Sequence, residues 1–516
     1  MFMPKIFPVT CHTDRVGPGS TYVAIAGFKQ DGSVYVQDAL KRGATTIVVQ
    51  KSEQIFTQLG IESGQDCVIR DGVTYLVVDD ARIALAELSR KTLGDPASKL
   101  KIIGITGTKG KSTTTWLIEH FLRAQGYKTA LIGGIKNRIL DEEEDSTLTT
   151  PSSDYLHMFF AECVKRGVSH VVMEVSAHAL SLYRVHGLEF VAVGFTNLDP
   201  EHMDFYKNLD EYFDAKYLLF SQVQDGGTIV INRDNPRGSK ASLKLSHNKS
   251  AALERKHDVL LGHVHEQVKE QTIISFGQKL QSNQELILFG VHDAHFLVEQ
   301  DGISGLKFNL ERALQVLSQV LSIETPKIFG IFNVYNISMA ALICLNLGVQ
   351  KEVLQEAIKN FTGVPGRLQV HILKNGARAF VDYAHNPSSM LAVLQVLRKL
   401  SKHLIVVFGC GGDRDKTKRP VMGALSAEIA DVTIVTSDNP RTEDPTQIIQ
   451  EILAGISLEQ REHVVCEPDR YKAIELAVSR SHKDSVIALL GKGHEEKYVS
   501  QGKTIFFSDF QEISRF

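Results

Sequence analysis

Short runs of apolar residues alternate with amphipathic stretches through the middle of the chain. The run "KIIGITG" at 101–107 leads into a glycine-rich turn, and "STTTWLIEHFLRAQG" at 112–126 has the apolar spacing of a helix that ends at a glycine. Further apolar runs, separated by helical stretches, lie at 128–135, 168–176, 190–198 and 226–234. This alternation predicts an α/β fold whose central domain, residues 99–364, is a doubly wound parallel sheet of the P-loop ATPase type.

The residues before this region predict a small N-terminal α/β domain over 1–98. Short strands are expected at 20–27 and 43–50, with a helix at 34–43 between them. Gly, Pro and polar residues at 89–100 predict a linker to the central domain.

A second strand and helix series predicts a Rossmann-like C-terminal α/β domain over 365–516, which makes three domains in all. Helices are expected at 387–400 and 445–456, and strands within 402–416, 431–441 and 485–496. The stretch 240–310 is more polar and irregular, and the pattern places few elements in it.

Composition narrows the class of protein. The chain has 516 residues, of which 43% are hydrophobic and 23% charged, and its net charge is −3, which argues against a nucleic-acid partner. Its six cysteines are scattered without C-x-x-C spacing, which favours reduced thiols in the cytoplasm over disulfides or zinc. Residues 1–15 lack the apolar core of a signal peptide, and the longest apolar runs are too short to span a bilayer, so no membrane insertion is expected.

The strongest local signal is "GITGTKGKSTTT" at 104–115. A strand enters the turn, Gly107 and Gly110 let backbone amides face inward, and a helix begins, which together suit an anion. Lys111 could reach the β- and γ-phosphates of ATP, and Ser112 could bind Mg²⁺. The G-x-x-x-x-G-K-[ST] spacing is not met, because Gly104 lies one residue too far back. A glycine-rich turn with a surface lysine is the alternative, but strand, G-K-S and helix together predict ATP as co-substrate.

Three further side chains follow predicted strands or lie on the next helix. Glu174 ends the strand in "VVMEVSAHAL", His202 follows the strand before "DPEHMDF", and Lys216 lies on the helix of "EYFDAKYLLF". Glu and His are acceptable ligands for the divalent metal that phosphoryl transfer needs. Taken one at a time, each could equally be a capped turn or a surface group.

These stretches resemble the Mur ligases. The matching segments are "GTKGKSTTT", in which Lys109 replaces an asparagine, "TTP" at 149–151, "MEVSAHAL", "FTNLDPEHMDF" and "YFDAKYLLF". The resemblance implies an ATP-dependent amide ligase of peptidoglycan precursor synthesis, and it is strongest to the members that make the UDP-MurNAc-tripeptide. It assigns catalysis to Lys111, Glu174, His202 and Lys216, and Mg²⁺ to Ser112, Glu174, His202 and a carbamylated Lys216. Carbamylation is chemically sensible, because it would turn an ammonium that repels Mg²⁺ into an anion.

The resemblance also implies the nucleotide and UDP-sugar sites. The ATP-binding residues would be Gly107, Thr108, Lys109, Gly110, Lys111, Ser112, Thr113, Asn333, Asn336, Arg367, Asp382 and His385, with the two asparagines facing adenine. The UDP-MurNAc-dipeptide would contact Thr149, Thr150, Ser176 and Arg184. The N-terminal "CHTDR" departs from the family pattern, because Asp14 stands where a serine is expected, and Asn386 stands where "DYAHTP" has threonine.

The tetrapeptide "DNPR" occurs twice, at 234–237 and at 438–441. We interpret the first copy as a turn after a strand and the second, with "GKGHEE" downstream, as the amino-acid pocket of ligases that add meso-diaminopimelate. The distal end of that amino acid carries a carboxylate and an ammonium, which Arg441 and Glu495 could bind respectively, whereas lysine would leave Arg441 without a partner. The resemblance completes the pocket with Arg414, Asp438, Asn439, Pro440 and Gly491.

Two other functions stay open at this point. One is a different amide ligase of the same superfamily, such as a lysine-adding or folylpolyglutamate-type enzyme. The other is a catalytically silent ATP-binding regulator, although Lys111, Glu174 and His202 are all present. The expected partners are the small-molecule substrates UDP-MurNAc-L-Ala-D-Glu and meso-diaminopimelate, and we expect a cytoplasmic monomer.

Overall fold

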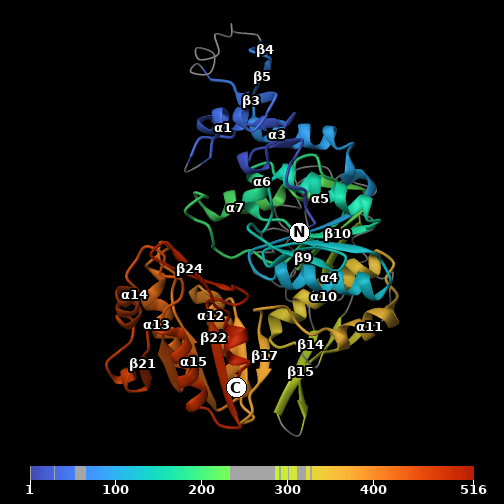
Figure 1. Ribbon diagram of the computed structural model, residues 1–516. Helices are drawn as coiled ribbons and strands as arrows, with labels where there is room; N and C mark the ends of the chain where they lie inside the picture. The colour runs from blue at the N-terminus through green and yellow to red at the C-terminus, as the bar shows by residue number, and fades with distance from the viewer. Residues whose placement is uncertain are drawn as a thin grey trace. The chain divides into compact units, whose positions relative to one another are not determined.

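The computed structural model describes residues 2–27, 30–52, 66–232, 285–289, 292–299, 302–310, 321–325 and 328–516 (Figure 1). The chain divides into two compact units. Unit 1 comprises Met1–His292, Asn309–Ser322 and Tyr335–Ile358, and unit 2 comprises Asp293–Phe308, Ile323–Val334 and Lys359–Phe516. The predicted α/β class is confirmed, because parallel strands dominate the sheets of both units.

The N-terminal part of unit 1 is a five-stranded sheet. Its order is β1 (Val9–Thr10), β2 (Thr21–Val23), β3 (Thr46–Gln50), β5 (Val73–Val78) and β4 (Cys67–Arg70), and only β4 runs antiparallel to its neighbour. Ala39 of α1 (Val36–Lys41) belongs to the core on one face, and Leu85 of α3 (Ala81–Thr92) to the core on the other.

The linker predicted at 89–100 is wrong in part, because these residues are folded against unit 1. Helix α3 continues to Thr92, and a 3₁₀ turn follows at Pro96–Lys99. Ser89, Ala97 and Leu100 are buried. The apolar side chains of this segment are packed in unit 1, and this tertiary packing overrides the loop preference of its Gly and Pro residues.

The central sheet of unit 1 has eight strands. Its order is β13 (Glu285–Phe289), β12 (Val223–Asn232), β11 (Phe190–Phe195), β6 (Lys101–Thr106), β10 (His170–Glu174), β7 (Thr129–Ile132), β8 (Lys136–Ile139) and β9 (Glu142–Asp145). The strands from β13 to β7 are parallel, as predicted, whereas β8 and β9 add an antiparallel edge that the sequence did not predict.

Helices cover both faces of this sheet, as a doubly wound fold requires. Apolar side chains of α5 (Ser153–Lys165), α6 (Ala177–Ser181) and α7 (Leu209–Tyr217) share one core with the sheet. Helices α4 (Lys111–Ala124) and α10 (Ile331–Asn346) meet where Cys344 Sγ lies 3.8 Å from Ile118 O. Strand β6 lies between β10 and β11, so the chain reverses its direction of winding there, and the carboxyl end of β6 is where such folds bind ligands.

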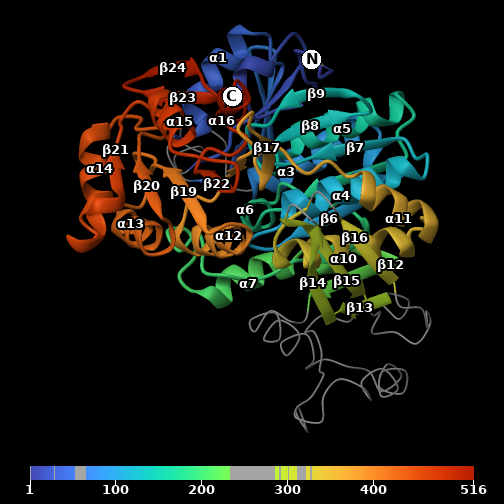
Figure 2. The same ribbon diagram turned by 90° about the horizontal axis from the view of Figure 1, so that it is seen from below.

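The C-terminal sheet, in unit 2, has six strands. Its order is β17 (Gln369–Ile372), β18 (Arg378–Asp382), β22 (Ser485–Leu490), β19 (His403–Phe408), β20 (Val432–Val435) and β21 (Val464–Cys466), with only β17 antiparallel. Helices α12 (Pro387–Leu400), α13 (Lys418–Ile429) and α14 (Pro445–Leu453) share one core. Helices α15 (Arg470–Ser479) and α16 (Asp509–Ile513) share the core on the opposite face (Figure 2). The predicted Rossmann-like arrangement is confirmed.

The remaining elements are smaller. Strands β14 (His292–Glu299), β15 (Gly302–Leu310) and β16 (Leu321–Thr325) form a three-stranded sheet, β23 (Lys497–Ser500) and β24 (Lys503–Phe506) form a hairpin, and α11 spans Lys351–Asn360. The first "DNPR" copy, with Asp234 and Arg237, lies outside the described residues, as does much of 240–310.

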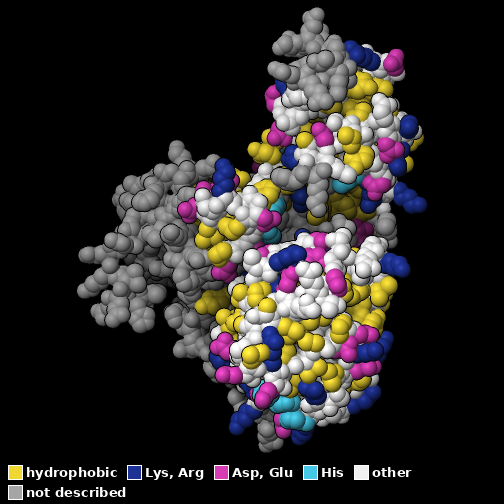
Figure 3. Space-filling view, turned by 90° about the vertical axis from the view of Figure 1, so that its left-hand side faces the viewer, with side chains coloured by type: hydrophobic (Ala, Val, Ile, Leu, Met, Phe, Trp, Pro, Cys, Tyr) yellow, Lys and Arg dark blue, Asp and Glu magenta, His cyan; other side chains and the backbone are white. Residues whose placement is uncertain are grey.

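All six cysteines are free thiols, as expected from their spacing. Among the described residues, no helix combines the length and apolarity needed to cross a membrane. On the face that Figure 3 draws, lysine and arginine side chains are interspersed with aspartate and glutamate.

Candidate active site

The glycine-rich turn connects β6 to α4 at the winding reversal of the central sheet. Gly107 and Gly110 adopt φ of 141° and 84°, which side chains other than glycine rarely adopt. A Cβ on Gly107 would overlap Thr196 Oγ1, and one on Gly110 would overlap Asn336 Oδ1. Both glycines are therefore required by conformation and by space, and the turn leaves the N-terminus of a 14-residue helix at its end.

The segment after β11 holds this turn in place, a role that the sequence analysis did not assign. Asn197 accepts from the Lys109 amide (2.8 Å) and donates to the Lys109 carbonyl (3.0 Å), and Thr196 Oγ1 donates to the same carbonyl (2.6 Å). Thr108 Oγ1 and the backbone of Asp199 exchange two hydrogen bonds of 3.2 and 3.0 Å. The residues that hold the turn belong to the "FTNLD" part of a matching segment, in which the sequence analysis considered only metal ligands.

Two lysines meet at the turn. Lys111 Nζ donates to the carbonyls of Gly107 and Thr108, at 2.9 Å each, and Lys216 Nζ donates to Gly107 at 2.9 Å. Lys216 is 1% exposed, so it is not the helix-surface lysine that was its alternative. Burial, reinforced by the charge of Lys111, lowers the pKa of Lys216 well below its usual value, so its neutral amine is favoured.

Glu174 ends β10, beside the turn. The carboxylate is 2% exposed, and its Oε1 accepts a hydrogen bond of 2.9 Å from the Gly134 amide. Ser112 is buried in the first turn of α4. His202 has φ of 60° and packs edge-on against the His178 ring at 4.6 Å, and burial lowers its pKa, which favours the neutral imidazole that binds metals.

These side chains are of types that bind Mg²⁺. No three His, Cys, Asp or Glu side chains cluster at a metal-binding distance among the described residues. Mg²⁺ commonly takes one or two carboxylates and completes its shell with water and substrate phosphate oxygens, so a single buried carboxylate beside a phosphate-binding turn suits it. Glu174, Ser112 and His202 are the residues that could hold the ion here.

Of the four residues predicted to contact the UDP-sugar substrate, Thr150, Ser176 and Arg184 form a hydrogen-bonded group next to Glu174. Thr150 Oγ1 donates to the Glu174 carbonyl (2.9 Å) and accepts from the Ser176 amide (3.0 Å), and Arg184 donates to the Thr150 carbonyl (2.8 Å). Ser176 caps the N-terminus of α6, and Thr149 Oγ1 lies beside Gly134. The structure therefore brings these four together.

The other predicted ATP residues divide between the two units. Asn336 belongs to unit 1 and accepts a long hydrogen bond of 3.4 Å from Thr114. Asn333, Arg367, Asp382 and His385 belong to unit 2. There Asn333 donates to Phe329 O (2.8 Å), and the Arg367 guanidinium lies 4.8 Å from the centre of the Tyr383 ring.

Asp382 is held at the end of β18. Its Oδ2 accepts from the Leu368 amide (2.7 Å) and its Oδ1 from the Ala384 amide (2.8 Å), while burial raises its pKa. His385 Nδ1 lies 2.8 Å from the Tyr383 carbonyl, and the His385 carbonyl accepts from Lys418 Nζ at 2.8 Å. The loop after β18 is thus rigidly organised around its predicted site residues.

The second "DNPR" copy follows β20, and its Asp438 and Asn439 side chains are buried. Asn439 donates to Glu495 Oε2 (2.7 Å) and accepts from the Val499 amide (2.9 Å). Asp438 lies against Gly491, where a Cβ would stand 2.6 Å from its Oδ2. Burial, with the charge of Asp438 next, raises the pKa of Glu495. This group at the carboxyl edge of the parallel sheet already contacts one ammonium, because Lys492 Nζ lies 3.4 Å from Asn439 Oδ1 and 3.8 Å from Glu495 Oε2.

Arg441 lies beside this group. Its guanidinium is partly buried and donates to the Gly412 carbonyl (2.7 Å), and its backbone adopts φ of 55° after Pro440. Arg414, by contrast, is exposed on the turn after β19, and no hydrogen bond joins it to Asn439, Arg441 or Glu495. Arg414 therefore lies on the turn whose Gly412 carbonyl accepts from Arg441, and the other six predicted amino-acid-binding residues lie on the segments after β20 and β22.

Comparison with known proteins bears on this arrangement. Three family models match: the "Mur ligase family, catalytic domain" at 6–92, the "Mur ligase middle domain" at 105–344 and the "Mur ligase, glutamate ligase domain" at 366–493. A relative from Clostridium botulinum, named UDP-N-acetylmuramoyl-L-alanyl-D-glutamate–2,6-diaminopimelate ligase, is 36% identical over 97% of this chain and 92% of its own length. The chain belongs to the Mur ligase family.

Solved structures agree with this assignment. A structure with the same name as the clostridial relative has 25% identity and a TM-score of 0.62, covering 99% of this Mur ligase and 94% of that chain. The MurF ligase of Thermotoga maritima, solved in complex with ADP, shares the fold with a TM-score of 0.59 at 16% identity, covering 94% of this Mur ligase and 93% of that chain. The expectation of an ATP-dependent acid–amino-acid ligase is confirmed.

Proposed function

We propose that this Mur ligase joins meso-diaminopimelate to UDP-MurNAc-L-Ala-D-Glu with ATP, in peptidoglycan precursor synthesis. The observation that carries the choice of amino acid is the chain of hydrogen bonds that links Arg441 to Glu495. The Arg441 guanidinium donates to the Gly412 carbonyl, and the Gly412 amide donates to the Asn439 carbonyl at 2.9 Å. The Asn439 side chain in turn donates to Glu495. A guanidinium and a carboxylate suit a distal carboxylate and a distal ammonium respectively. The printed names of the relatives support the same substrates.

The reaction proceeds in two steps at the side chains described above. A carboxylate oxygen of the dipeptide attacks the γ-phosphorus of ATP, forming an acyl phosphate and releasing ADP. The amine of the amino acid then attacks the acyl carbon, the C–O bond to phosphate breaks, and the amine loses a proton as the amide forms. The turn after β6 and Lys111 would orient the phosphates, so positioning and electrostatics supply most of the rate.

Mg²⁺ would be held by Glu174, His202 and Ser112, and it would neutralise phosphate charge when bound.

We propose that Lys216 is carbamylated on Nζ. Burial lowers the pKa of Lys216, so its amine is favoured in the neutral form that can react with CO₂. A carbamate there would supply a second anionic group next to the phosphate-binding turn.

We also propose the three domains 1–98, 99–364 and 365–516. The family models at 6–92, 105–344 and 366–493 support these boundaries.

A cytoplasmic monomer is proposed as well, and six unpaired thiols suit a reducing compartment. Sedimentation of the purified protein tests the oligomeric state.

A ligation assay tests the function. Purified protein is incubated with ATP, Mg²⁺, UDP-MurNAc-L-Ala-D-Glu and either meso-diaminopimelate or L-lysine, and the product is identified by mass. We expect the diaminopimelate product and at most traces of the lysine product. Transfer of ¹⁸O from the labelled dipeptide carboxylate into phosphate would report the acyl phosphate, and ligation without such transfer would contradict the mechanism.

A further inference from the structure

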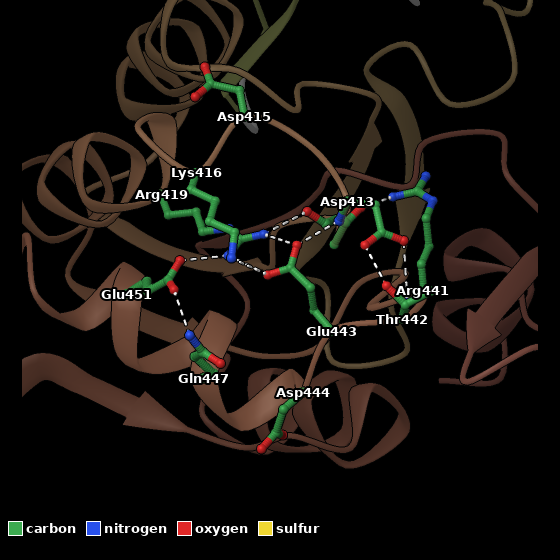
Figure 4. Close-up of polar contacts among 12 residues, drawn as sticks. Asp413, Asp415, Lys416, Arg419, Arg441, Thr442, Glu443, Asp444, Gln447 and Glu451 are labelled. Carbon is green, nitrogen blue, oxygen red and sulfur yellow. Dashed lines mark hydrogen bonds and ion pairs between the residues drawn. The ribbon is translucent and has the colours of Figure 1, made fainter. Parts of the chain in front are cut away.

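A completely buried arginine lies behind the proposed amino-acid pocket. The Arg419 side chain, on α13, is 0% exposed and binds two carboxylates (Figure 4). Its Nη1 and Nη2 each lie 3.0 Å from a different oxygen of Glu443, and Nη1 lies 2.6 Å from Glu451 Oε2. Nη2 also donates to the Gly411 carbonyl at 3.3 Å. Removing a guanidinium and its carboxylate partners from water costs free energy. A network of this kind therefore indicates a role for its position in the fold.

The same network joins the two turns that carry Arg414 and Arg441. Glu443 accepts from the Asp413 amide at 2.6 Å and pairs with Lys416 at 3.1 Å, so one carboxylate links α13 to the turn after β19. Asp413 in turn accepts from Thr442 Oγ1 at 2.6 Å and from the Thr442 amide at 3.3 Å. Thr442 and Glu443, the two residues after Arg441, are therefore tied to the turn that accepts its guanidinium hydrogen bond.

Arg441 needs this support, because its own backbone is unfavourable. A residue other than glycine at φ of 55° is strained unless its surroundings hold it. The Arg441 amide donates to Val499 O at 3.0 Å, and its carbonyl accepts from the Gln501 amide at 2.5 Å. On the other side, Gly412 approaches so closely that a Cβ would overlap the Pro440 carbonyl. The guanidinium is thus aimed by contacts on both flanks.

We propose that Arg419 and Glu443 are positioning residues for amino-acid selectivity. They touch no substrate; they fix the direction of the Arg441 guanidinium, which binds the distal carboxylate of the added amino acid. This inference rests on the proposed function. It assigns a role to two charged residues that the sequence analysis did not single out.

Glu451 offers a matched control within the same network. It binds the same guanidinium from α14, and its other oxygen accepts from Gln447 at 3.2 Å, but it contacts neither of the two turns. Replacing either glutamate by glutamine removes one charge from Arg419 and keeps the size of the side chain. A purely structural role predicts equal effects on catalysis, whereas a positioning role predicts that only Glu443 matters for the amino acid.

The test compares E443Q and E451Q under steady-state conditions. We expect E443Q to raise the KM for meso-diaminopimelate about tenfold and to shrink the preference over L-lysine, because small displacements of a binding group are costly. The KM for ATP and kcat at saturating amino acid should stay within about twofold of the parent values, and E451Q should leave all three unchanged within that range. An unchanged diaminopimelate KM in E443Q, or equal shifts in both variants, overturns the proposal.

A second variant guards against misfolding of E443Q. Asp413 is exposed, and D413N weakens its link to Thr442 without leaving a buried charge. We expect a rise of about threefold in the same KM, and no rise in a folded D413N overturns the proposal if E443Q cannot be purified. Failure of the function itself is distinguishable, because the parent enzyme would then not ligate diaminopimelate at all.

Discussion

Lys216 and Lys111 donate to the same carbonyl, that of Gly107, yet their surroundings differ. Lys216 is buried beside the Tyr212 ring, whereas Lys111 lies at the start of α4. If Lys216 is carbamylated, K216A should reduce turnover at least about a hundredfold, because an anion next to the phosphates is lost. Added short-chain carboxylic acids should restore part of the activity.

The control for K216A is K207A, which removes an exposed lysine just before the same helix and should leave turnover unchanged. Steady-state assays with and without acetate or formate supply the comparison. Full activity of unrescued K216A would rule out the proposed role.

Lys111 is half-buried, and its Nζ donates hydrogen bonds to the Gly107 and Thr108 carbonyls of the turn. We expect K111A to lower kcat about a hundredfold or more, since the group that orients the phosphates is gone. The circular dichroism spectrum should stay that of the parent, and turnover near the parent value would refute the assignment of the turn.

Arg441 carries the strongest selectivity prediction. R441A removes a charge-assisted contact to a carboxylate, so kcat/KM for meso-diaminopimelate should fall by roughly a hundredfold or more, and discrimination against L-lysine should shrink. R237A, in the other copy of the tetrapeptide, is the matched deletion and should alter neither quantity. Competition assays with both amino acids would measure the ratio, and equal effects of the two variants would mean that the wrong copy was chosen.

The turn between β6 and α4 shows how an element constrains its residues. Gly107 has φ of 141° and no room for a Cβ next to Thr196, whereas Gly126, after α4, has φ of 91° and nothing within 4 Å of a Cβ. G126A should cost only about 1–2 kcal/mol of unfolding free energy, from backbone strain. G107A should cost more, because the Thr196 bond that holds the turn must break, and it should weaken ATP binding. Urea unfolding and nucleotide titration check both.

Strand and helix elements were the part of the fold most open to prediction. Buried strands such as β6, β10 and β22 contain continuous apolar runs, and α4 ends at the glycine that the pattern indicated. Strands β8 and β9 were not predicted, because their sequences, "KNRI" and "EEED", are polar. They join the sheet only by pairing with β7 and with each other. Local pattern cannot reveal an element whose stability comes from its neighbours.

The residues of the site could be predicted from sequence motifs, but the burial and the contacts of those residues could not. The turn and Glu174 were found from residue types and their places at strand ends, and the "DNPR" copy after β20 was found through the family resemblance. Burial of Lys216 and Arg419 was not, because a lysine or arginine on a helix normally lies at the surface and is buried only when distant residues supply partners. For Arg419 those partners, Glu443 and Glu451, lie 24 and 32 residues further along the chain.

At the scale of the whole molecule, the two units have separate hydrophobic cores. Large chains built this way commonly depart from two-state unfolding. Unit 2 also contains a buried ion pair that ties α16 to the sheet: Arg470 donates to Asp509 at 2.7 and 2.6 Å, and to the carbonyls of Leu490 and Ser437, at the ends of β22 and just after β20. Those carbonyls immediately precede Gly491 and Asp438 of the proposed pocket.

D509N would leave the Arg470 guanidinium buried without the charge of the carboxylate that it pairs with, and such a change costs about 3–5 kcal/mol. Because the pair lies within unit 2, we expect calorimetry to show two transitions of which D509N lowers only one, while G107A lowers the other. The surface pair of Arg42 and Asp38 supplies the control, since D38N should shift neither transition measurably. A single transition moved as a whole by either variant would mean that the units unfold together, and the stability of the amino-acid pocket would then depend on the entire chain rather than on unit 2.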